Sequence, residues 1–285
     1  MTIRGVVLDF DGTFTDVDAE GRPFVAAYRR FVDDLTGRDL TTLWDAEEAE
    51  VAAHPTRYGW LYDGKVVAPG NADPYIRTTT TAQRVFDTLG ILKDGAHRFA
   101  VMQLLYKEAY AHTHAVFKPE AREVLDAITA TGLPVFVVTN ATPEVVKDKI
   151  DALGLAQRDR VSIHGDAKKY VICGLGEPDA RFDALPETMA VEGLTERRVY
   201  LKRGKYYRAL RDIWTQLGVQ PSELILAGDI WELDLSLPAA LGFRVQLVSR
   251  PDTPPHERAA VAALGERGGV SDSLQAVIDR VRASR

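Results

Sequence analysis

Residues 3–13 read IRGVVLDFDGT, an apolar run that ends at two aspartates and a glycine. Valine, isoleucine and leucine without polar alternation are typical of a strand covered on both faces. Gly12 permits a sharp turn directly after such a strand. Asp9 and Asp11 occupy alternate positions, so both carboxylates can face the same side of an extended chain. The stretch therefore predicts a buried strand with two acidic groups at its carboxyl end.

Three further apolar runs of this kind follow, at residues 133–139, 223–228 and 243–248. Between them lie segments with apolar residues at helical spacing, at residues 119–131, 142–153, 206–217, 238–241 and 273–281. Several of these helices have proline at the start or glycine just past the end. Strands that alternate with helices form parallel sheets with right-handed crossovers. We therefore expect a doubly wound, Rossmann-like α/β core.

The section from residue 16 to residue 117 has a different pattern. It is mostly helical, with expected helices at residues 24–35, 45–53, 81–89 and 97–111. Within it, the sequence Tyr62-Asp63-Gly64-Lys65 predicts a tight turn between two short strands. The pattern predicts two domains: an α/β core made of residues 1–15 and 118–285, and an inserted, mostly helical domain at residues 16–117.

Composition limits the class of protein. Of the 285 residues 46% are hydrophobic and 27% charged, and the formal net charge is -6, so the chain as a whole does not attract nucleic acid or an anionic membrane. Cys173 is the single cysteine, which excludes an intrachain disulfide. No cleavable signal pattern opens the chain, and no apolar run approaches the roughly 20 residues of a membrane span. We expect a cytoplasmic, soluble protein.

Polar side chains also follow the second and third apolar runs. Thr139 and Asn140 close the second run, and Asp229 follows the third, with Asp234 five residues later. The carboxyl ends of parallel strands share one edge of the sheet, where ligands bind. Acidic groups gathered there need an opposing positive charge. Oxygen ligands of this kind suit Mg²⁺, which joins protein carboxylates to a substrate phosphate.

Together these motifs resemble the haloacid dehalogenase superfamily. The stretch Asp9 to Thr13 is similar to the family's first motif in its phosphatase form, and Thr139 stands where the second motif has serine or threonine. Gly228-Asp229 with Asp234 resembles the acidic fourth motif, and the inserted section resembles the family's helical cap domain. The match extends over most of the chain, and its combination of motifs is more specific than any one of them.

The resemblance implies a role for each acidic group. Asp9 would attack phosphorus and form an aspartyl-phosphate, and Asp11 would act as general acid and then as general base. Asp9, Asp229 and the backbone carbonyl of Asp11 would hold Mg²⁺. Asp234 would orient a water molecule or the active-site lysine.

The resemblance also implies substrate-binding positions. Thr139 would bind the transferring phosphoryl group, and we expect Asn140 and Gly12 to contribute beside it. The substrate would be a phosphorylated small molecule, and the pattern defines neither its identity nor the oligomeric state.

The active-site lysine of the third motif is the point at which the sequence departs from the family. The family has this lysine just before the helix that leads to the third apolar run. Lys202 and Lys205 both lie there, but neither has the usual spacing from Asp229. Lys168 and Lys169 follow another strand candidate at residues 161–163 and remain open as alternatives. We expect Lys202 to be the catalytic lysine.

Three other functions compete with phosphomonoester hydrolysis. A haloacid-type dehalogenase would lack the need for Asp11, because no leaving alcohol requires a proton. A sugar phosphomutase would need a cap that excludes water. A non-catalytic binding protein would keep the fold without turnover. The retained pair of acids in the first motif favours the phosphatase.

Overall fold

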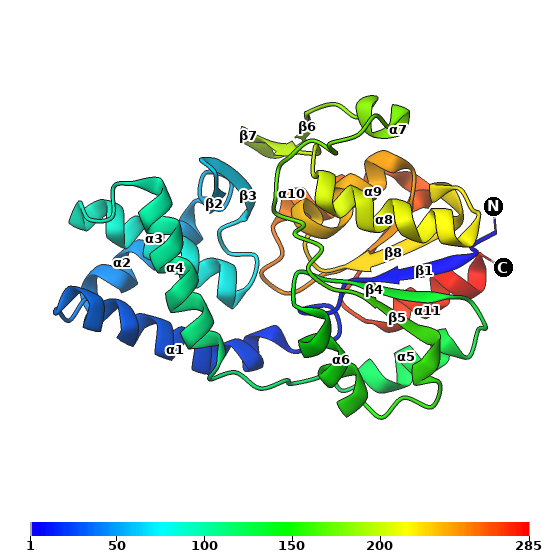
Figure 1. Ribbon diagram of the computed structural model, residues 1–285, viewed down its shortest axis with the longest axis horizontal. Helices are drawn as coiled ribbons and strands as arrows, with labels where there is room; N and C mark the ends of the chain where they lie inside the picture. Colours follow the sequence, from blue (N-terminus) through cyan, green and yellow to red (C-terminus); the bar gives the residue numbers. More distant parts are fainter. Residues whose placement is uncertain (1, 285) are drawn as a thin grey trace. The chain divides into compact units, whose positions relative to one another are not determined.

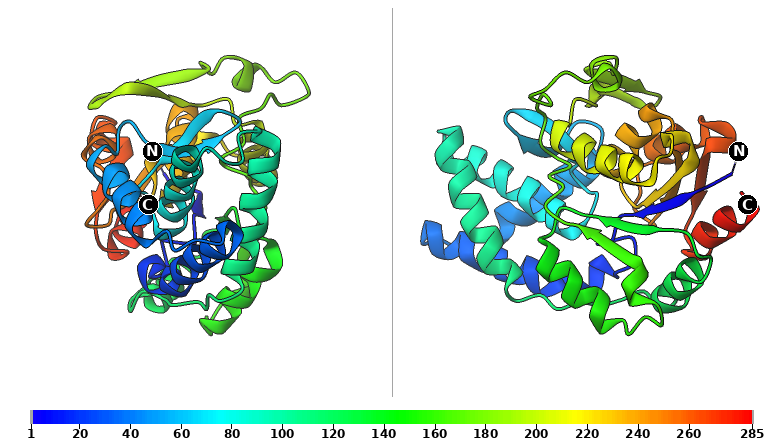
Figure 2. Two further views of the ribbon diagram at one scale, coloured as in Figure 1. Left: turned by 90° about the vertical axis from the view of Figure 1, so that its left-hand side faces the viewer. Right: turned by 45° about the vertical axis from the view of Figure 1, so that its right-hand side comes forward.

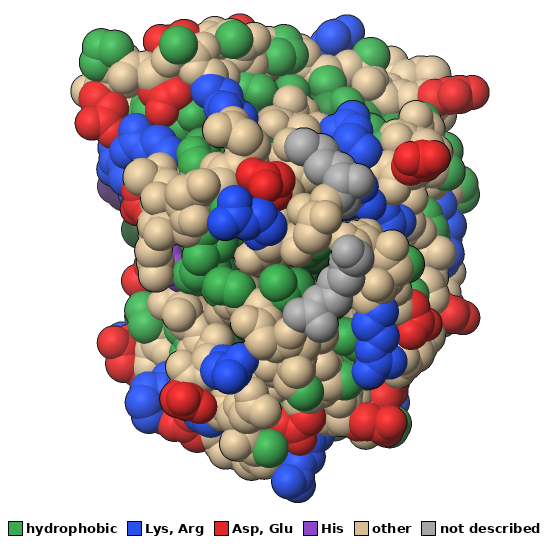
Figure 3. Space-filling view, turned by 90° about the vertical axis from the view of Figure 1, so that its right-hand side faces the viewer, with side chains coloured by type: hydrophobic (Ala, Val, Ile, Leu, Met, Phe, Trp, Pro, Cys, Tyr) green, Lys and Arg blue, Asp and Glu red, His purple; other side chains and the backbone are tan. Residues whose placement is uncertain are grey.

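The computed structural model describes residues 2–284. They divide into two compact units, which we call the core unit and the inserted unit (Figure 1). The core unit contains the residues up to Thr15 together with those from Phe117 onward, and the inserted unit is Asp16–Val116. Within the described residues, no helix combines the length and the apolar character that crossing a membrane requires. On the face drawn in Figure 3, basic and acidic side chains are interspersed.

The core unit is built on a six-stranded sheet in the order β10-β9-β8-β1-β4-β5, with every neighbouring pair parallel. The strands are β1 (Gly5–Leu8), β4 (Val135–Val138), β5 (Val161–His164), β8 (Leu224–Gly228), β9 (Arg244–Val248) and β10 (Gly268–Ser271). The chain runs from β1 to β4 and β5 on one side, then returns to β8 on the other. The order therefore reverses at β1, and the expected doubly wound α/β core is confirmed.

Helices cover both faces of this sheet. Figures 1 and 2 show α8, α9 and α10 on one face and α5, α6 and α11 on the other. Their bounds are α5 (Ala121–Thr129), α6 (Pro143–Ala152), α8 (Gly204–Leu217), α9 (Ser236–Leu241), α10 (Pro255–Ala262) and α11 (Gln275–Ala283). In β1, Val7 packs into the hydrophobic cluster of the first face, while Val6 and Leu8 pack into that of the second. Burial on both sides explains why the strand has no polar alternation.

Smaller elements complete the core unit. A segment between β5 and α8 contains α7 (Ala180–Asp183) and an antiparallel hairpin of β6 (Thr188–Val191) and β7 (Leu194–Tyr200). The short helical turns are η1 (Arg158–Arg160), η2 (Pro221–Glu223), the π-helical η3 (Trp231–Leu235) and η4 (Gly265–Arg267). The sequence pattern had not indicated β10 or α10. The two glycines that open β10 leave it without the apolar run that marks the other strands.

The inserted unit contains four helices and one hairpin among the described residues. They are α1 (Val17–Thr36), α2 (Thr41–Ala53), β2 (Gly59–Tyr62), β3 (Lys65–Pro69), α3 (Pro74–Leu89) and α4 (Gly95–Tyr110). The hairpin has the expected turn, because Tyr62 pairs with Lys65 and both Asp63 and Gly64 have positive φ. Phe24, Tyr28 and Phe86 are fully buried in its hydrophobic cluster.

All four helices of the inserted unit begin earlier than the sequence predicted, two of them by seven residues. The helix expected from residue 24 starts at Val17, because the Asp16 side chain caps it and the chain continues helically through Pro23. The helix expected from residue 81 starts at Pro74. Its run of threonines stays helical because the hydroxyls of Thr78 and Thr79 donate to carbonyls of the preceding turn.

Candidate active site

The carboxyl edge of the core sheet gathers the acidic residues from separate strands. Asp9 follows β1 directly, Asp229 follows β8, and Asp234 lies in the π-helical turn after it. β1 and β8 are paired neighbours in the sheet, so their ends are adjacent. One carboxylate oxygen from each of Asp9, Asp229 and Asp234 lies within 4.8 Å of the others, and all three residues are buried.

Lys169 joins two of these acids. Its ammonium donates to Asp9 Oδ1 at 2.6 Å and to Asp234 Oδ1 at 2.8 Å, and the lysine is 1% exposed. The second oxygen of Asp9 accepts from the Thr13 hydroxyl at 3.0 Å. The second oxygen of Asp234 accepts from the Ile230 backbone N–H at 3.0 Å. Every oxygen of the two carboxylates therefore has a donor, and their orientations are defined by these bonds.

Burial and neighbouring charges raise the pKa values of both Asp9 and Lys169, but for different reasons. Burial raises the pKa of Asp9 well above its ordinary value, and the carboxylates of Asp234 and Asp229 raise it further against the opposing effect of Lys169. Burial lowers the pKa of Lys169, but Asp234 and Asp9 outweigh it, so its pKa lies above the ordinary value. The ammonium is thus charged, and the acids carry more negative charge than it alone offsets.

The donor set fits a hard divalent cation. Asp9, Asp229 and Asp234 offer only carboxylate oxygens, the ligand type that Mg²⁺ takes. Burial is the main cause of the raised pKa of Asp9, and the carboxylates of Asp234 and Asp229 add to it; a cation beside these acids would oppose both effects. Within the described residues, the Asp11 side chain is not part of this group, so its expected contribution is through the backbone carbonyl.

Asp229 has an arginine partner. The Arg250 guanidinium donates from Nη1 to Asp229 Oδ2 at 2.5 Å, and both side chains are buried. Gly12 lies against the same carboxylate: a Cβ added there would sit 2.4 Å from Asp229 Oδ2, and the glycine has a φ of +81°. The backbone N–H of Gly12 donates to Thr15 Oγ1 at 2.9 Å. Gly12 therefore makes room for Asp229, and the prediction that it binds substrate stays a prediction.

Asp11 has partners of its own beside the three-acid group. Its Oδ1 accepts from the Lys149 ammonium at 2.6 Å, and its Oδ2 lies 3.5 Å from the Thr139 hydroxyl. Lys149 lies on α6 and is almost fully buried. Asp11 is the more exposed of the two aspartates of the first motif, with 29% of its side chain accessible against 8% for Asp9. This carboxylate can reach a ligand at the edge of the sheet.

The expectation that Lys202 is the active-site lysine is wrong. Its ammonium donates to the backbone carbonyls of Phe182 at 2.5 Å and Asp183 at 3.1 Å, away from the acids. Lys205 is exposed on α8, and Lys168 pairs with an exposed aspartate. The residue at the acids is Lys169.

The position of Lys169 has a clear structural cause. Asn140 Oδ1 accepts its backbone N–H at 2.7 Å, and Arg203 Nη1 donates to its carbonyl at 2.7 Å. The side-chain oxygen of Asn140, which was expected to bind substrate, therefore accepts a hydrogen bond from the backbone of Lys169. Lys169 follows β5, which borders β4. The strand candidate at residues 161–163 was therefore the sequence feature that could have identified this lysine. The α7–β6–β7 segment separates Lys169 from α8 and disturbs the spacing that the family pattern uses.

Sequence reasoning also missed three cations of this region: Lys149, Arg203 and Arg250. Arg203 is fully buried, and burial lowers its pKa to about 10. Tyr206, one turn along α8, donates its hydroxyl to the Asp234 carbonyl at 2.6 Å. None of these residues belongs to a recognisable spacing pattern, because each depends on tertiary packing.

A second buried cluster in the core unit contains Glu232, His256 and Glu257. Arg197 holds Glu232 through two parallel hydrogen bonds of 2.5 Å, and His256 Nε2 lies 3.5 Å from the same carboxylate. Burial, and then the nearby Glu232, raises the pKa of Glu257 to about 8. The bidentate arginine already neutralises the ionised carboxylate, so we interpret the cluster as a structural ion-pair network.

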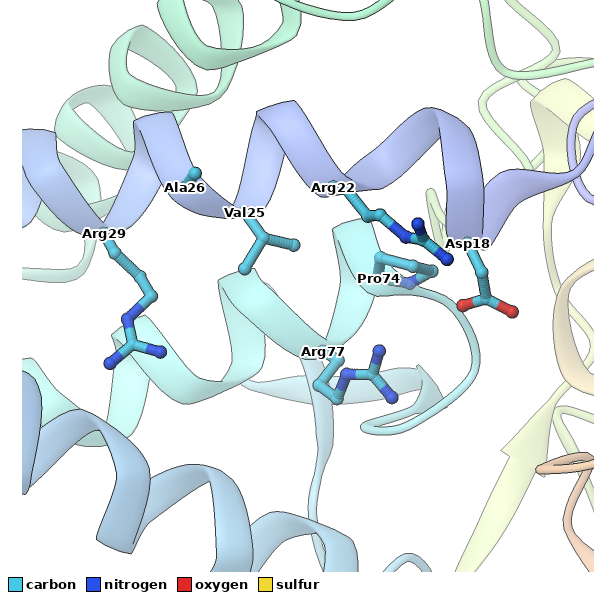
Figure 4. Close-up of a pocket in the computed structure, with 7 residues that line it drawn as sticks. All are labelled: Asp18, Arg22, Val25, Ala26, Arg29, Pro74 and Arg77. Atoms are coloured by element: carbon cyan, nitrogen blue, oxygen red, sulfur yellow. The ribbon is translucent and has the colours of Figure 1, made fainter. Parts of the chain in front are cut away.

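The inserted unit has a cavity of about 420 Å³ of a different character (Figure 4). In Figure 4, Arg22 and Arg77 point toward the same space around Pro74. Arg77 pairs with Glu48 at 3.5 Å, and Arg29, which also lines the cavity, pairs with Asp45 at 2.7 Å. The seven lining residues, which are Asp18, Arg22, Val25, Ala26, Arg29, Pro74 and Arg77, offer no nucleophile paired with a base. The core unit is therefore the better candidate for catalysis.

Comparison with known proteins gives a family match and several solved structures of similar fold. The family described as haloacid dehalogenase-like hydrolase matches residues 3–242. No curated protein matches the sequence. A solved structure described as a predicted phosphoglycolate phosphatase from Haemophilus somnus 129PT is 12% identical, with a TM-score of 0.53 and 98% of each chain covered.

Two further solved structures illustrate the range of similar folds. A HAD-hydrolase from Bacillus subtilis bound to magnesium is 12% identical, with a TM-score of 0.50 over 99% of this chain and 100% of that one. An L-2-haloacid dehalogenase from Xanthobacter autotrophicus is 19% identical, with a TM-score of 0.47 and 98% of each chain covered. At 12% identity, the likeness to the Bacillus subtilis structure shows the fold.

Proposed function

The chain belongs to the haloacid dehalogenase-like hydrolases, and we propose that within this family it is a magnesium-dependent phosphomonoester hydrolase. The observation that carries the proposal is the arrangement of four acids. Asp9, Asp229 and Asp234 form one buried group beside Lys169, while Asp11 stands outside that group with partners of its own. This separation supports the assignment of Asp9 as the nucleophile beside a cation and of Asp11, which is held by Lys149, as the group that transfers protons.

Asp9 is the proposed nucleophile. Lys169 and Thr13 hold its two oxygens in fixed directions, which reduces the entropy lost on reaching the attacking geometry. A carboxylate oxygen of Asp9 forms a bond to phosphorus, and the bond between phosphorus and the leaving oxygen breaks. The product of this step is an aspartyl-phosphate.

Asp11 is the proposed general acid and base. In the first step it gives its proton to the leaving oxygen, so that an alcohol departs. In the second step it removes a proton from water, which attacks phosphorus and breaks the bond to Asp9. Phosphate leaves and both carboxyl groups return to their starting states. Lys149 and Thr139 position the Asp11 carboxylate for these transfers.

Asp9, Asp229 and the backbone carbonyl of Asp11 would hold Mg²⁺. The ion would supply positive charge to the phosphoryl oxygens as negative charge develops there. Lys169 contributes a second positive charge from the protein and donates hydrogen bonds to both Asp9 and Asp234. Asp234, whose two oxygens are bonded to Lys169 and to the Ile230 N–H, acts by orienting the lysine.

The test is phosphate release from a panel of phosphorylated metabolites, with Mg²⁺ and with a chelator. We expect wild-type turnover that requires Mg²⁺ and is lost in Asp9→Asn. The matched control is Asp272→Asn, which removes an exposed carboxylate of the core unit and leaves turnover unchanged.

Parallel assays with a haloacid, a sugar phosphate and phosphorylated ligands distinguish the competing functions. Metal-independent release of halide from a haloacid, without phosphate release, would indicate a dehalogenase. Movement of phosphate between hydroxyls of one sugar would indicate a phosphomutase. Binding of phosphorylated ligands without any turnover would indicate a non-catalytic protein. Each of these three results contradicts the proposal.

A further inference from the structure

We propose that Arg250 is a built-in counter-ion of Asp229 that competes with the divalent cation for this carboxylate. When the cation binds, the Arg250 guanidinium moves its main contact from Asp229 to Asp252. The inference rests on the proposed function, because it assumes a cation site at Asp9 and Asp229. It adds a protein residue that controls how tightly the site takes its metal.

The first support is the contact itself. Arg250 Nη1 lies 2.5 Å from Asp229 Oδ2, and the two side chains are 7% and 2% exposed. A charge-assisted bond at this distance is a strong one, and burial limits screening by salt. One oxygen of the Asp229 carboxylate belongs to the three-acid group. A cation held by this carboxylate therefore competes with the arginine for its negative charge.

The second support is that a different carboxylate lies within reach of the same guanidinium. Arg250 Nε lies 3.4 Å from Asp252 Oδ1, a longer and weaker contact than the one to Asp229. The Asp252 side chain is 35% exposed, so it remains solvated whether or not the arginine pairs with it. Arg250 can transfer its main contact from the buried acid to the more exposed one.

The third support is that the backbone of Arg250 is fixed while its side chain contacts both Asp229 and Asp252. Its N–H donates to Thr253 Oγ1 at 2.8 Å, and its carbonyl accepts from Arg258 Nη2 at 2.5 Å. The exchange between Asp229 and Asp252 then needs only side-chain rotation. Such a motion is local and does not require the loop after β9 to unfold.

The charges of the site explain how Arg250 affects both stability and metal affinity. Lys169 is shared between Asp9 and Asp234, and Arg250 places a further positive charge against Asp229. Removing one partner of a buried ion pair is strongly destabilising. Arg250 therefore stabilises the metal-free protein, and for the same reason it weakens the affinity for the metal.

The experiment measures Mg²⁺ binding by isothermal titration calorimetry and thermal unfolding with and without Mg²⁺. We expect Arg250→Gln to bind Mg²⁺ about tenfold more tightly than wild type, a difference of about 1.4 kcal/mol. Its unfolding temperature without metal falls, and Mg²⁺ raises it by more than in wild type. Asp252→Asn removes the alternative partner, so its Mg²⁺ affinity falls. Arg122→Gln, an exposed arginine on α5, is the control and matches wild type.

Two results would overturn the inference. If wild type binds Mg²⁺ and folded Arg250→Gln binds it equally or more weakly, Arg250 is a structural partner only. If Asp252→Asn, which alters a partly exposed side chain, leaves the affinity unchanged, the exchange does not occur, and this arm holds even if Arg250→Gln fails to fold. Failure of the proposed function has a different signature: neither wild type nor any variant binds Mg²⁺.

Discussion

The ammonium of Lys169 lies 2.6 Å from Oδ1 of Asp9, although the two residues are 160 positions apart in the chain. The contact exists because β1 and β5 both border β4 and end at the same edge of the sheet. It defines the candidate active site, and the predictions below depend on it.

Lys169→Met should remove activity and stability together. The loss of a positive charge beside the reacting phosphoryl group lowers kcat by about 10²–10³-fold. The buried carboxylates of Asp9 and Asp234 lose their shared partner, which costs about 3–5 kcal/mol. Steady-state kinetics and denaturant unfolding measure the two effects. Lys202→Met is the matched control: its ammonium donates to the backbone carbonyls of Phe182 and Asp183, so kcat should stay near the wild-type value.

Asp11→Asn should show a dependence on the leaving group. An asparagine cannot protonate the departing oxygen, so kcat falls by about 10²–10⁴-fold for alkyl phosphates, whose leaving alkoxides are strongly basic. An aryl phosphate with an acidic leaving group needs no such proton and should lose less in its first step. Single-turnover kinetics with both substrates test this. An equal loss for both would mean that Asp11 is not the general acid.

Gly12→Ala should weaken the cation site as well as the fold. The added Cβ would lie 2.4 Å from Asp229 Oδ2, so the carboxylate must move. Gly218→Ala is matched in backbone conformation, with a φ of +62°, but has nothing within 4 Å of its added Cβ. Both variants lose about 1–2 kcal/mol from the left-handed conformation. Only Gly12→Ala should also lower the affinity for Mg²⁺, as calorimetry would show.

Glu257→Gln should change how stability depends on pH. The pKa of Glu257 rises from 4.5 to about 8 on folding, so between these pH values the unfolded chain has released a proton that the folded protein retains. The free energy of unfolding therefore falls as pH rises from about 4.5 to about 8. The glutamine removes this effect, and the variant should be more stable than wild type at pH 8, on the order of a few kcal/mol.

Thermal unfolding across this pH range tests the effect of Glu257. The two proteins should converge at the acidic end, where Glu257 is protonated in both states. Glu266→Gln, which changes an exposed glutamate, should follow the wild-type curve. A parallel offset at every pH would show that the glutamine acts through packing alone.

The sequence predicted the central part of the fold because its strands are buried on both faces. The apolar runs at β1, β4, β8 and β9 have no alternation, and each matches a strand of the sheet. The acids of the site could be predicted for the same reason: Asp9 and Asp229 follow such runs directly, and parallel strands bring those ends together.

Other features could not be predicted because they depend on tertiary contacts. Lys169 lies at the acids through bonds to Asn140 and Arg203, and no spacing rule reveals those bonds. Arg250 reaches Asp229 from a loop after β9. The early start of α3 depends on threonine hydroxyls that bond back to the preceding turn, where threonine alone favours no helix.

The most direct test of the account is identification of the covalent intermediate. Wild-type protein would be mixed with a substrate identified by the metabolite panel and Mg²⁺, quenched in acid, digested and analysed by mass spectrometry. We predict a phosphoryl group on the peptide that contains Asp9, and none in Asp9→Asn. Steady turnover with no phosphorylated peptide, or turnover that survives in Asp9→Asn, would contradict the account.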